Sequence, residues 1–180
     1  MDDEKIELIR QNVLQAGNDL MYLNTMSKYM NNDLFNELFA PIYFAMQQDL
    51  YICLAKLVDS GNKKKETAGS INTLIKSNDT EDKKYHKMLS KYHDDVESIK
   101  KRRNKIFAHN ITINNQQKLF DDYPVKNVEG LLKTITEIII DIDSSKAKAY
   151  YTNNANQFDR YMKYFDTKLK EVSSNERRSA

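Results

Sequence analysis

The sequence predicts an all-α fold, an up-and-down bundle of about five to six helices. Apolar residues recur every three or four positions along most of the 180-residue chain, which is the period of a helix with one buried face. The chain has only 4 glycines and 2 prolines, too few for the tight turns of an all-β protein. Its length suits one domain, which we place at residues 1–172, followed by a polar tail at 173–180 that we expect to be disordered.

The first two predicted helices are the longest apolar segments. A single apolar stripe marks a helix over residues 6–30, and Asn31, Asn32 and Asp33 break it and offer a cap for the next helix. Residues 34–58 are apolar nearly all round, which predicts a helix buried at the centre of the bundle. The residues Asp59-Ser60-Gly61 end it.

Residues 60–70 are predicted to form a loop and residues 71–75 a helical turn. A long helix is predicted at residues 82–109, followed by a loop or short extended piece at 110–125. Two further helices are predicted at residues 128–142 and 158–172. The acidic residues Asp79, Glu81 and Asp82 stand at the start of the long helix, where the helix dipole favours negative charge. No internal repeat and no strand pattern is present in the sequence.

Composition excludes several classes of protein. The 28 basic residues nearly balance the 26 acidic ones, so binding to nucleic acid must rest on a local patch. Cys53 is the one cysteine, which excludes a disulfide framework and a cysteine-based zinc site, and we interpret it as a buried hydrophobic residue. The acidic N-terminus is not a signal peptide, and the apolar runs are far shorter than the about 20 residues that span a bilayer. We expect a soluble, cytoplasmic protein without a membrane partner.

A local patch is present near the end of the predicted 82–109 helix. Five of the six residues at 100–105 are basic, namely Lys100, Lys101, Arg102, Arg103 and Lys105. A solvated, capped helix end would explain a basic run by itself. On a helical wheel that starts at Tyr92, however, Arg103 lies in the apolar stripe, whereas Arg102 and His109 lie together on one flank. An arginine in a core stripe is costly unless it is paired or lines a cleft, so this helix end is the candidate site.

A carboxylate on the second helix is the other unusual residue. Asp49 stands among the inward positions of that helix, and a buried carboxylate needs a cation or hydrogen-bond donors. Arg102 or Arg103 is the natural partner, either in a structural ion pair or with Asp49 orienting the site. His86 and His93 lie on one helix face but have no third ligand, so we expect no metal and no cofactor.

Residues 103–109, with the sequence RNKIFAH, resemble the signature of the HEPN superfamily, which is an arginine and, a few residues later, a histidine near the end of a core helix. Asn104 fits the polar residue that usually follows the arginine. Lys105 and Ala108 fit the form found in HEPN-like proteins of the abortive-infection type U group.

The resemblance to this group extends over roughly residues 35–140. The segment 49–59 is similar to the second helix of the group. The group usually has an arginine where Lys56 stands, so the role of that position does not carry over directly.

This resemblance implies a metal-independent endoribonuclease that acts as a homodimer, with two motifs facing each other across one composite site. His109 would take the proton from a ribose 2′-OH, and Arg103 would hold the phosphate and stabilise its developing charge. Asn104 would orient the phosphate or the histidine. The products would be a 2′,3′-cyclic phosphate and a 5′-OH. Sequence-independent attraction to the RNA backbone would come from Lys100, Lys101, Arg102 and Lys105.

The biological role implied is phage defence by abortive infection, or action as a toxin, with an antitoxin or defence-system protein as a possible partner beside the RNA substrate. Two alternatives stay open. One is a non-catalytic HEPN module that binds RNA, nucleotides or a partner protein, and the other is a helical oligomerisation domain that uses the first-helix stripe. The choice of arginine is also open, because the motif selects Arg103 whereas helix geometry places Arg102 beside His109.

Overall fold

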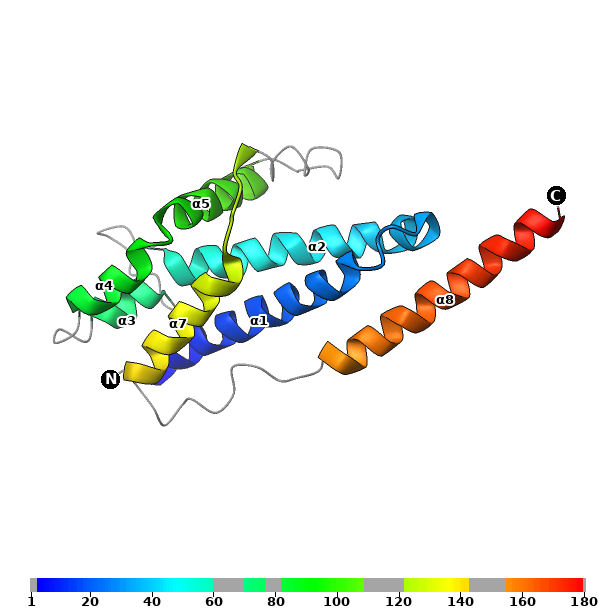
Figure 1. Ribbon diagram of the computed structural model, residues 1–180. Coiled ribbons are helices and arrows are strands. Elements are labelled where there is room, and N and C mark those ends of the chain that lie inside the picture. Colours follow the sequence, from blue (N-terminus) through cyan, green and yellow to red (C-terminus); the bar gives the residue numbers. More distant parts are fainter. Residues whose placement is uncertain (1–2, 60–69, 77–81, 109–121, 143–154, 180) are drawn as a thin grey trace.

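The computed structural model describes residues 3–59, 70–76, 82–108, 122–142 and 155–179. These residues form seven helices and no strand, so the predicted all-α fold is confirmed (Figure 1). The helices are α1 (Asp3–Ser27), α2 (Asp33–Val58), α3 (Ile71–Lys76), α4 (Asp82–Ser90), α5 (His93–Ala108), α7 (Val128–Ile142) and α8 (Ala155–Ser179).

Helices α1 and α2 form a long antiparallel hairpin at the centre of the molecule (Figure 1). The predicted break between them is confirmed. Asn32 is the N-cap of α2, and its Oδ1 accepts hydrogen bonds from the amides of Leu34 at 3.1 Å and Phe35 at 3.4 Å. The cap satisfies two amides that a helix start leaves without intrahelical partners.

The main core lies between α1, the C-terminal half of α2, α3, α4, α5 and α7. The predicted stripe of α1 is buried there, and α7 contributes an apolar face that solvent does not reach. The largest contributions of these two helices are Ile6, Ile9, Val13, Leu131, Leu132, Ile135, Ile138 and Ile139. Apolar burial of this kind is the main source of stability for the bundle.

Helix α2 is buried along only part of its length, which corrects the prediction that it is the buried centre throughout. Leu50 to Val58 are almost all buried, whereas Leu38 is 58% exposed and Ile42 is 50% exposed. Helices α3 and α5 pack on the C-terminal half of α2, whereas α8 contacts the N-terminal half at Phe35 and Phe39 and leaves Leu38 and Ile42 exposed. An apolar composition predicts that these side chains favour burial, but it does not predict whether another helix packs on them.

The predicted helix over residues 82–109 is two helices. The chain turns at Lys91 and Tyr92, where the amide of Tyr92 bonds to the carbonyl of Leu89 at 3.0 Å, and α5 begins at His93. Among the α5 side chains whose burial the structure describes, Asp95, Ile99 and Arg102 are buried, whereas Val96 is only partly buried.

Helix α8 packs against the turn between α1 and α2. Met162 joins Met26 and Phe35 in a second small core, and Asn32 Nδ2 donates to Asp166 Oδ1 at 3.1 Å. The helix continues to Ser179, although the sequence predicts a disordered tail at residues 173–180. Glutamate and arginine are good helix formers, so a polar composition alone does not end a helix.

None of the described helices is both long and apolar enough to cross a membrane.

Candidate functional site

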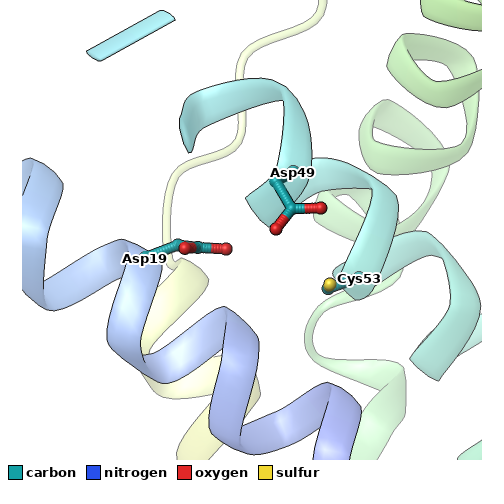
Figure 2. A group of neighbouring side chains, drawn as sticks. All are labelled: Asp19, Asp49 and Cys53. Atoms are coloured by element: carbon teal, nitrogen blue, oxygen red, sulfur yellow. The ribbon is translucent and has the colours of Figure 1, made fainter. Parts of the chain in front are cut away.

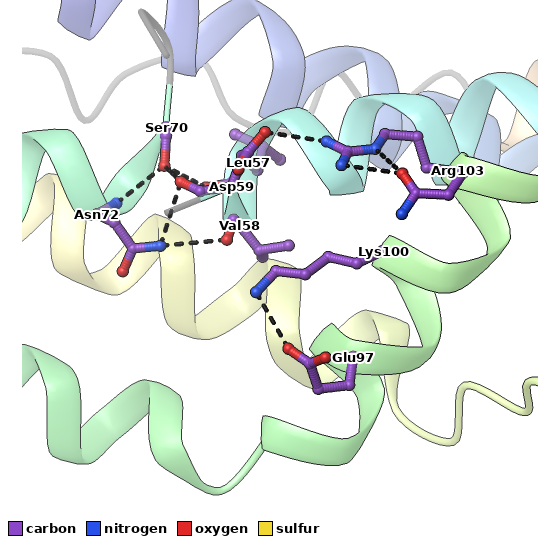
Figure 3. A network of polar contacts seen from close by, with 9 residues as sticks. Leu57, Val58, Asp59, Ser70, Asn72, Glu97, Lys100 and Arg103 are labelled. Atoms are coloured by element: carbon purple, nitrogen blue, oxygen red, sulfur yellow. Dashed lines mark hydrogen bonds and ion pairs between the residues drawn. The ribbon is translucent and has the colours of Figure 1, made fainter. Parts of the chain in front are cut away.

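The C-terminal end of α2 is held by side chains from the start of α3. Ser70 Oγ donates to the carbonyl of Leu57 at 3.4 Å and also contacts the carbonyl of Asp59. Asn72 Nδ2 donates to the carbonyl of Val58 at 3.2 Å (Figure 3). Carbonyls at a helix end lack intrahelical partners, so these bonds satisfy them and fix the backbone of the C-cap, Asp59.

Asp59 in turn binds Arg103 of α5. Arg103 Nη1 lies 2.9 Å from Asp59 Oδ2, and the two side chains are 25% and 28% exposed (Figure 3). The opposite edge of the guanidinium faces the next residue, because Arg103 Nε and Nη2 both donate to Asn104 Oδ1 at 3.2 Å. The guanidinium is therefore held from two sides while part of it remains accessible to solvent.

Arg102 is the buried arginine of the pair. The residue is 3% exposed, its guanidinium carbon lies 4.3 Å from the centroid of the Tyr51 ring on α2, and Arg102 Nε donates to the carbonyl of Tyr123 at 2.5 Å. Burial raises the pKa of Tyr51, and the nearby Arg102 charge lowers it by a smaller amount. Arg102 thus links α5 to α2 and to the segment that leads into α7.

These positions correct the helical wheel. The wheel places Arg103 in the apolar stripe and Arg102 on its flank, whereas in the structure Arg102 is buried and Arg103 lies at the boundary with solvent. The cause is the composition of the buried face of α5, because two of its three buried residues, Asp95 and Arg102, are charged, whereas Val96 of the apolar stripe is only partly buried. The inward arginine that needs partners is therefore Arg102, which has them in the Tyr51 ring and the Tyr123 carbonyl.

The segment before α7 packs on the face of α5 that carries Arg102. Asp95 is 8% exposed, and its Oδ1 accepts a hydrogen bond from the amide of Lys126 at 2.7 Å. The ammonium of Lys101 lies 5.9 Å from the centroid of the Tyr123 ring, within the range of a cation–π contact. The segment from Tyr123 to Lys126 is therefore held against the face of α5 that carries Arg102.

The other basic residues of the patch point toward solvent. Lys101, Asn104 and Lys105 are exposed, and Lys100 is partly exposed. Lys100 Nζ lies 3.1 Å from Glu97 Oε1 (Figure 3), and its hydrogen bond lowers the pKa of Glu97. The basic patch therefore surrounds Arg103 on the surface, with Arg102 below it.

Asp49 does not pair with either arginine, which corrects that prediction. Its side chain is exposed and lies at the contact between α1 and α2, where Asp49 Oδ2 accepts a hydrogen bond from Gln15 Nε2 at 3.1 Å. The acid that binds Arg103 is Asp59, at the C-cap of the same helix. From sequence alone Asp59 is only a helix end, although it belongs to the segment 49–59, which contributes to the resemblance.

His109 lies outside the described residues. It follows Ala108, the last residue of α5, directly in the sequence. The structure therefore places the arginine and the asparagine of the RNKIFAH segment, and the role of the histidine stays a prediction.

A protein-family model matches most of the chain. The model described as "HEPN_AbiU2: AbiU2" matches residues 3–145, a range that contains α1 to α7 together with Asp59, Arg102, Arg103 and His109. Searches of curated proteins and of solved structures found no match.

Proposed function

The chain belongs to the HEPN AbiU2 family, and on this premise we propose that it is a metal-independent endoribonuclease of abortive infection or a related toxin. In the proposed reaction, a ribose 2′-oxygen attacks the adjacent phosphorus and the bond from phosphorus to the 5′-oxygen breaks. The products are a 2′,3′-cyclic phosphate and a 5′-OH. The observation that carries the proposal is the partly exposed guanidinium of Arg103, held by Asp59 and Asn104 just before His109.

Arg103 is the proposed phosphate-binding residue. Its Nη1 is held by Asp59, and its Nε and Nη2 form one edge that meets the exposed amide of Asn104. Two parallel N–H groups match two phosphate oxygens, so a phosphate would replace the Asn104 carbonyl on this edge. The displaced amide would then be free to bind the phosphate or the histidine. In this position Arg103 would stabilise the negative charge that develops on phosphorus in the transition state.

Arg102 is proposed to position the site rather than to bind RNA. A residue that is 3% exposed and hydrogen-bonded to a backbone carbonyl has little surface left for a phosphate. Its contacts with Tyr51 and Tyr123 fix α5, the helix that carries Arg103. We therefore assign the arginine of the motif to Arg103.

His109 is the proposed general base. An imidazole titrates near pH 7, so its neutral form would accept the 2′-OH proton. We further propose that two copies of the chain place their motifs across one cleft, which would supply a second set of groups for the leaving 5′-oxygen. The exposed Lys101 and Lys105, with Lys100, would attract the RNA backbone without regard to sequence. Light scattering checks the dimer, and a monomer at working concentration would contradict it.

The experiment that tests the proposal incubates the purified full chain with RNA in excess EDTA. We expect cleavage to persist in the chelator, to be lost in His109→Ala and Arg103→Ala, and to be kept in Arg10→Ala. Arg10 is the matched control, because it is an arginine on α1 that pairs with Glu7 at 2.8 Å. Cleavage that stops in EDTA at a temperature where the chain stays folded, or that is unchanged in His109→Ala, contradicts the proposal.

One observation favours a second candidate, a non-catalytic HEPN module. Both edges of the Arg103 guanidinium already have acceptors within the chain, Asp59 and Asn104, so an RNA phosphate must compete with them. This alternative predicts RNA binding that weakens steeply with salt but gives no cleavage products. The EDTA experiment separates the two.

A further inference from the structure

A second group of reactive side chains lies at the contact between α1 and α2. Asp19 of α1 faces Asp49 and Cys53 of α2 (Figure 2), and one oxygen of each carboxylate and the Cys53 sulfur all lie within 4.8 Å of one another. None of these three residues contacts Arg103 or Asn104. The proposed ribonuclease reaction makes no use of this cluster.

The Asp19 carboxylate lacks the partners that a buried charge requires. The residue is 4% exposed, and its Oδ2 is buried with no hydrogen-bond partner among the described residues. Its Oδ1 accepts from Gln15 Nε2 at 3.0 Å, and the same nitrogen donates to Asp49 Oδ2 at 3.1 Å. Within the described ranges neither aspartate forms an ion pair. One neutral amide is thus shared by two neighbouring carboxylates, which does not compensate two negative charges.

We propose that Asp19, Asp49 and Cys53 bind a zinc ion that ties α1 to α2. Two carboxylate oxygens and one sulfur are ligands that Zn²⁺ accepts in a four-coordinate site, whereas a thiolate disfavours Ca²⁺ and Mg²⁺. The buried Oδ2 of Asp19 would receive a partner, and the cation would offset the repulsion between the two carboxylates. Gln15 is placed to supply the fourth ligand, because rotation of its amide would present Oε1 in place of Nε2. The count of a single cysteine excluded a site made only of cysteines, but it does not exclude this mixed set.

The cluster must lose protons before it can hold a cation. Burial, and next the charge of Asp49, raise the pKa of Asp19 to about 6. Burial and the same aspartate raise the pKa of the Cys53 thiol to about 11. Both groups must lose their protons to bind a metal, so zinc affinity is expected to rise with pH, and binding is expected to release protons.

The test uses the full chain after dialysis against a chelator and a return to metal-free buffer. Addition of Co²⁺, which has the same coordination preferences as zinc and absorbs light, should give a thiolate-to-cobalt charge-transfer band that Zn²⁺ then removes. Titration of Zn²⁺ against a chromophoric chelator should give one ion per chain. The band should be absent in Cys53→Ser, and the zinc affinity of Asp19→Asn should fall at least about 10-fold, the loss that even outer-shell changes cause.

The matched control is Asp141→Asn. Asp141 is an exposed carboxylate of α7 that pairs with Lys84 at 2.6 Å, and its replacement should leave the cobalt band and the zinc affinity unchanged. Folding of each variant is checked by circular dichroism. Asp19→Asn removes one charge from the cluster, so the metal-free variant should be at least as stable as the metal-free parent chain.

Two results overturn the proposal. One is a parent chain without the charge-transfer band, and the other is a band or zinc affinity that is the same in Cys53→Ser. In either case the cluster would be two neighbouring carboxylates, Asp19 and Asp49, that share one proton and bind no zinc. Neither result bears on RNA cleavage, which Cys53→Ser and Asp19→Asn should retain whether or not zinc binds.

Discussion

Arg103 and Asp59 form an ion pair between the last turns of α5 and the C-cap of α2, with Nη1 and Oδ2 2.9 Å apart. Ser70 and Asn72 fix the backbone around Asp59, so the direction of the guanidinium is set by the end of α2 and by the start of α3. This relationship makes Asp59 the acid that positions the arginine of the motif.

Replacement of Asp59 by asparagine is expected to reduce cleavage more than it reduces stability. A pair that is about one quarter exposed contributes little to folding, about 1 kcal/mol or less, but its loss frees the guanidinium to rotate away from the phosphate. Urea unfolding and RNA cleavage of Asp59→Asn measure the two effects. Asp141→Asn, which breaks the exposed pair with Lys84, is the control. A large loss of stability with unchanged cleavage would contradict a positioning role.

Substitution of Arg102 is expected to lower the free energy of unfolding much more than substitution of Arg103. Arg102→Ala removes a buried guanidinium, its hydrogen bond to the Tyr123 carbonyl and its contact with the Tyr51 ring, so we expect a loss of about 2–4 kcal/mol in the free energy of unfolding. Arg103→Ala removes a partly exposed pair and should cost about 1 kcal/mol or less, while abolishing cleavage. Denaturant unfolding of both variants checks this contrast, and equal losses of stability would refute it.

The stability of the metal-free chain is expected to fall as pH rises through the range in which Asp19 ionises. Its pKa is raised from 3.8 to about 6, so the folded state binds the proton more tightly than the unfolded state. This contribution is fully present below about pH 4 and is lost as pH rises through about 6, an effect on the order of 1–3 kcal/mol. Asp19→Asn should abolish this part of the pH dependence. Urea midpoints between pH 4 and 7 measure it, and identical profiles for the two proteins would contradict the assignment.

Asn32 is expected to stabilise two helix contacts at once. Its Oδ1 caps α2, and its Nδ2 donates to Asp166 of α8. Asn32→Ala should therefore lower the free energy of unfolding by about 1–2 kcal/mol, the upper part of the range for loss of a cap. Asn36→Ala is the control, since Asn36 is exposed on α2. Thermal unfolding that does not distinguish the two variants would contradict this dual role.

The sequence predicted those features that depend on local pattern. The stripe from Ile6 to Leu23 and the cap at Asn32 are determined by neighbouring residues, so periodicity and cap preference located them. The predicted buried face of α5 was wrong because two of its three buried residues, Asp95 and Arg102, are charged, so an apolar stripe does not locate that face. The turn at Lys91 and Tyr92, which separates α4 from α5, was also missed. The sequence around this turn contains neither glycine nor proline to indicate it.

The partners of the charged residues could not be predicted, because they come from segments distant in the sequence. Arg103 meets Asp59 through the packing of α5 on α2, and Asp49 meets Asp19 through the packing of α1 on α2. Helix periodicity places each residue on a face but does not specify which face of a neighbour lies opposite. The assignment of Arg102 as the buried arginine and Arg103 as the accessible one therefore required the structure.

The central claim is most directly tested by the chemistry of the cleaved ends. The account predicts that the chain, in EDTA, cuts an RNA to leave a 2′,3′-cyclic phosphate and a 5′-OH. It also predicts that the same RNA with 2′-O-methyl groups at the cut positions stays intact, because the attacking oxygen is then blocked. Cleavage of the methylated RNA, or products that carry a 5′-phosphate, would contradict the account.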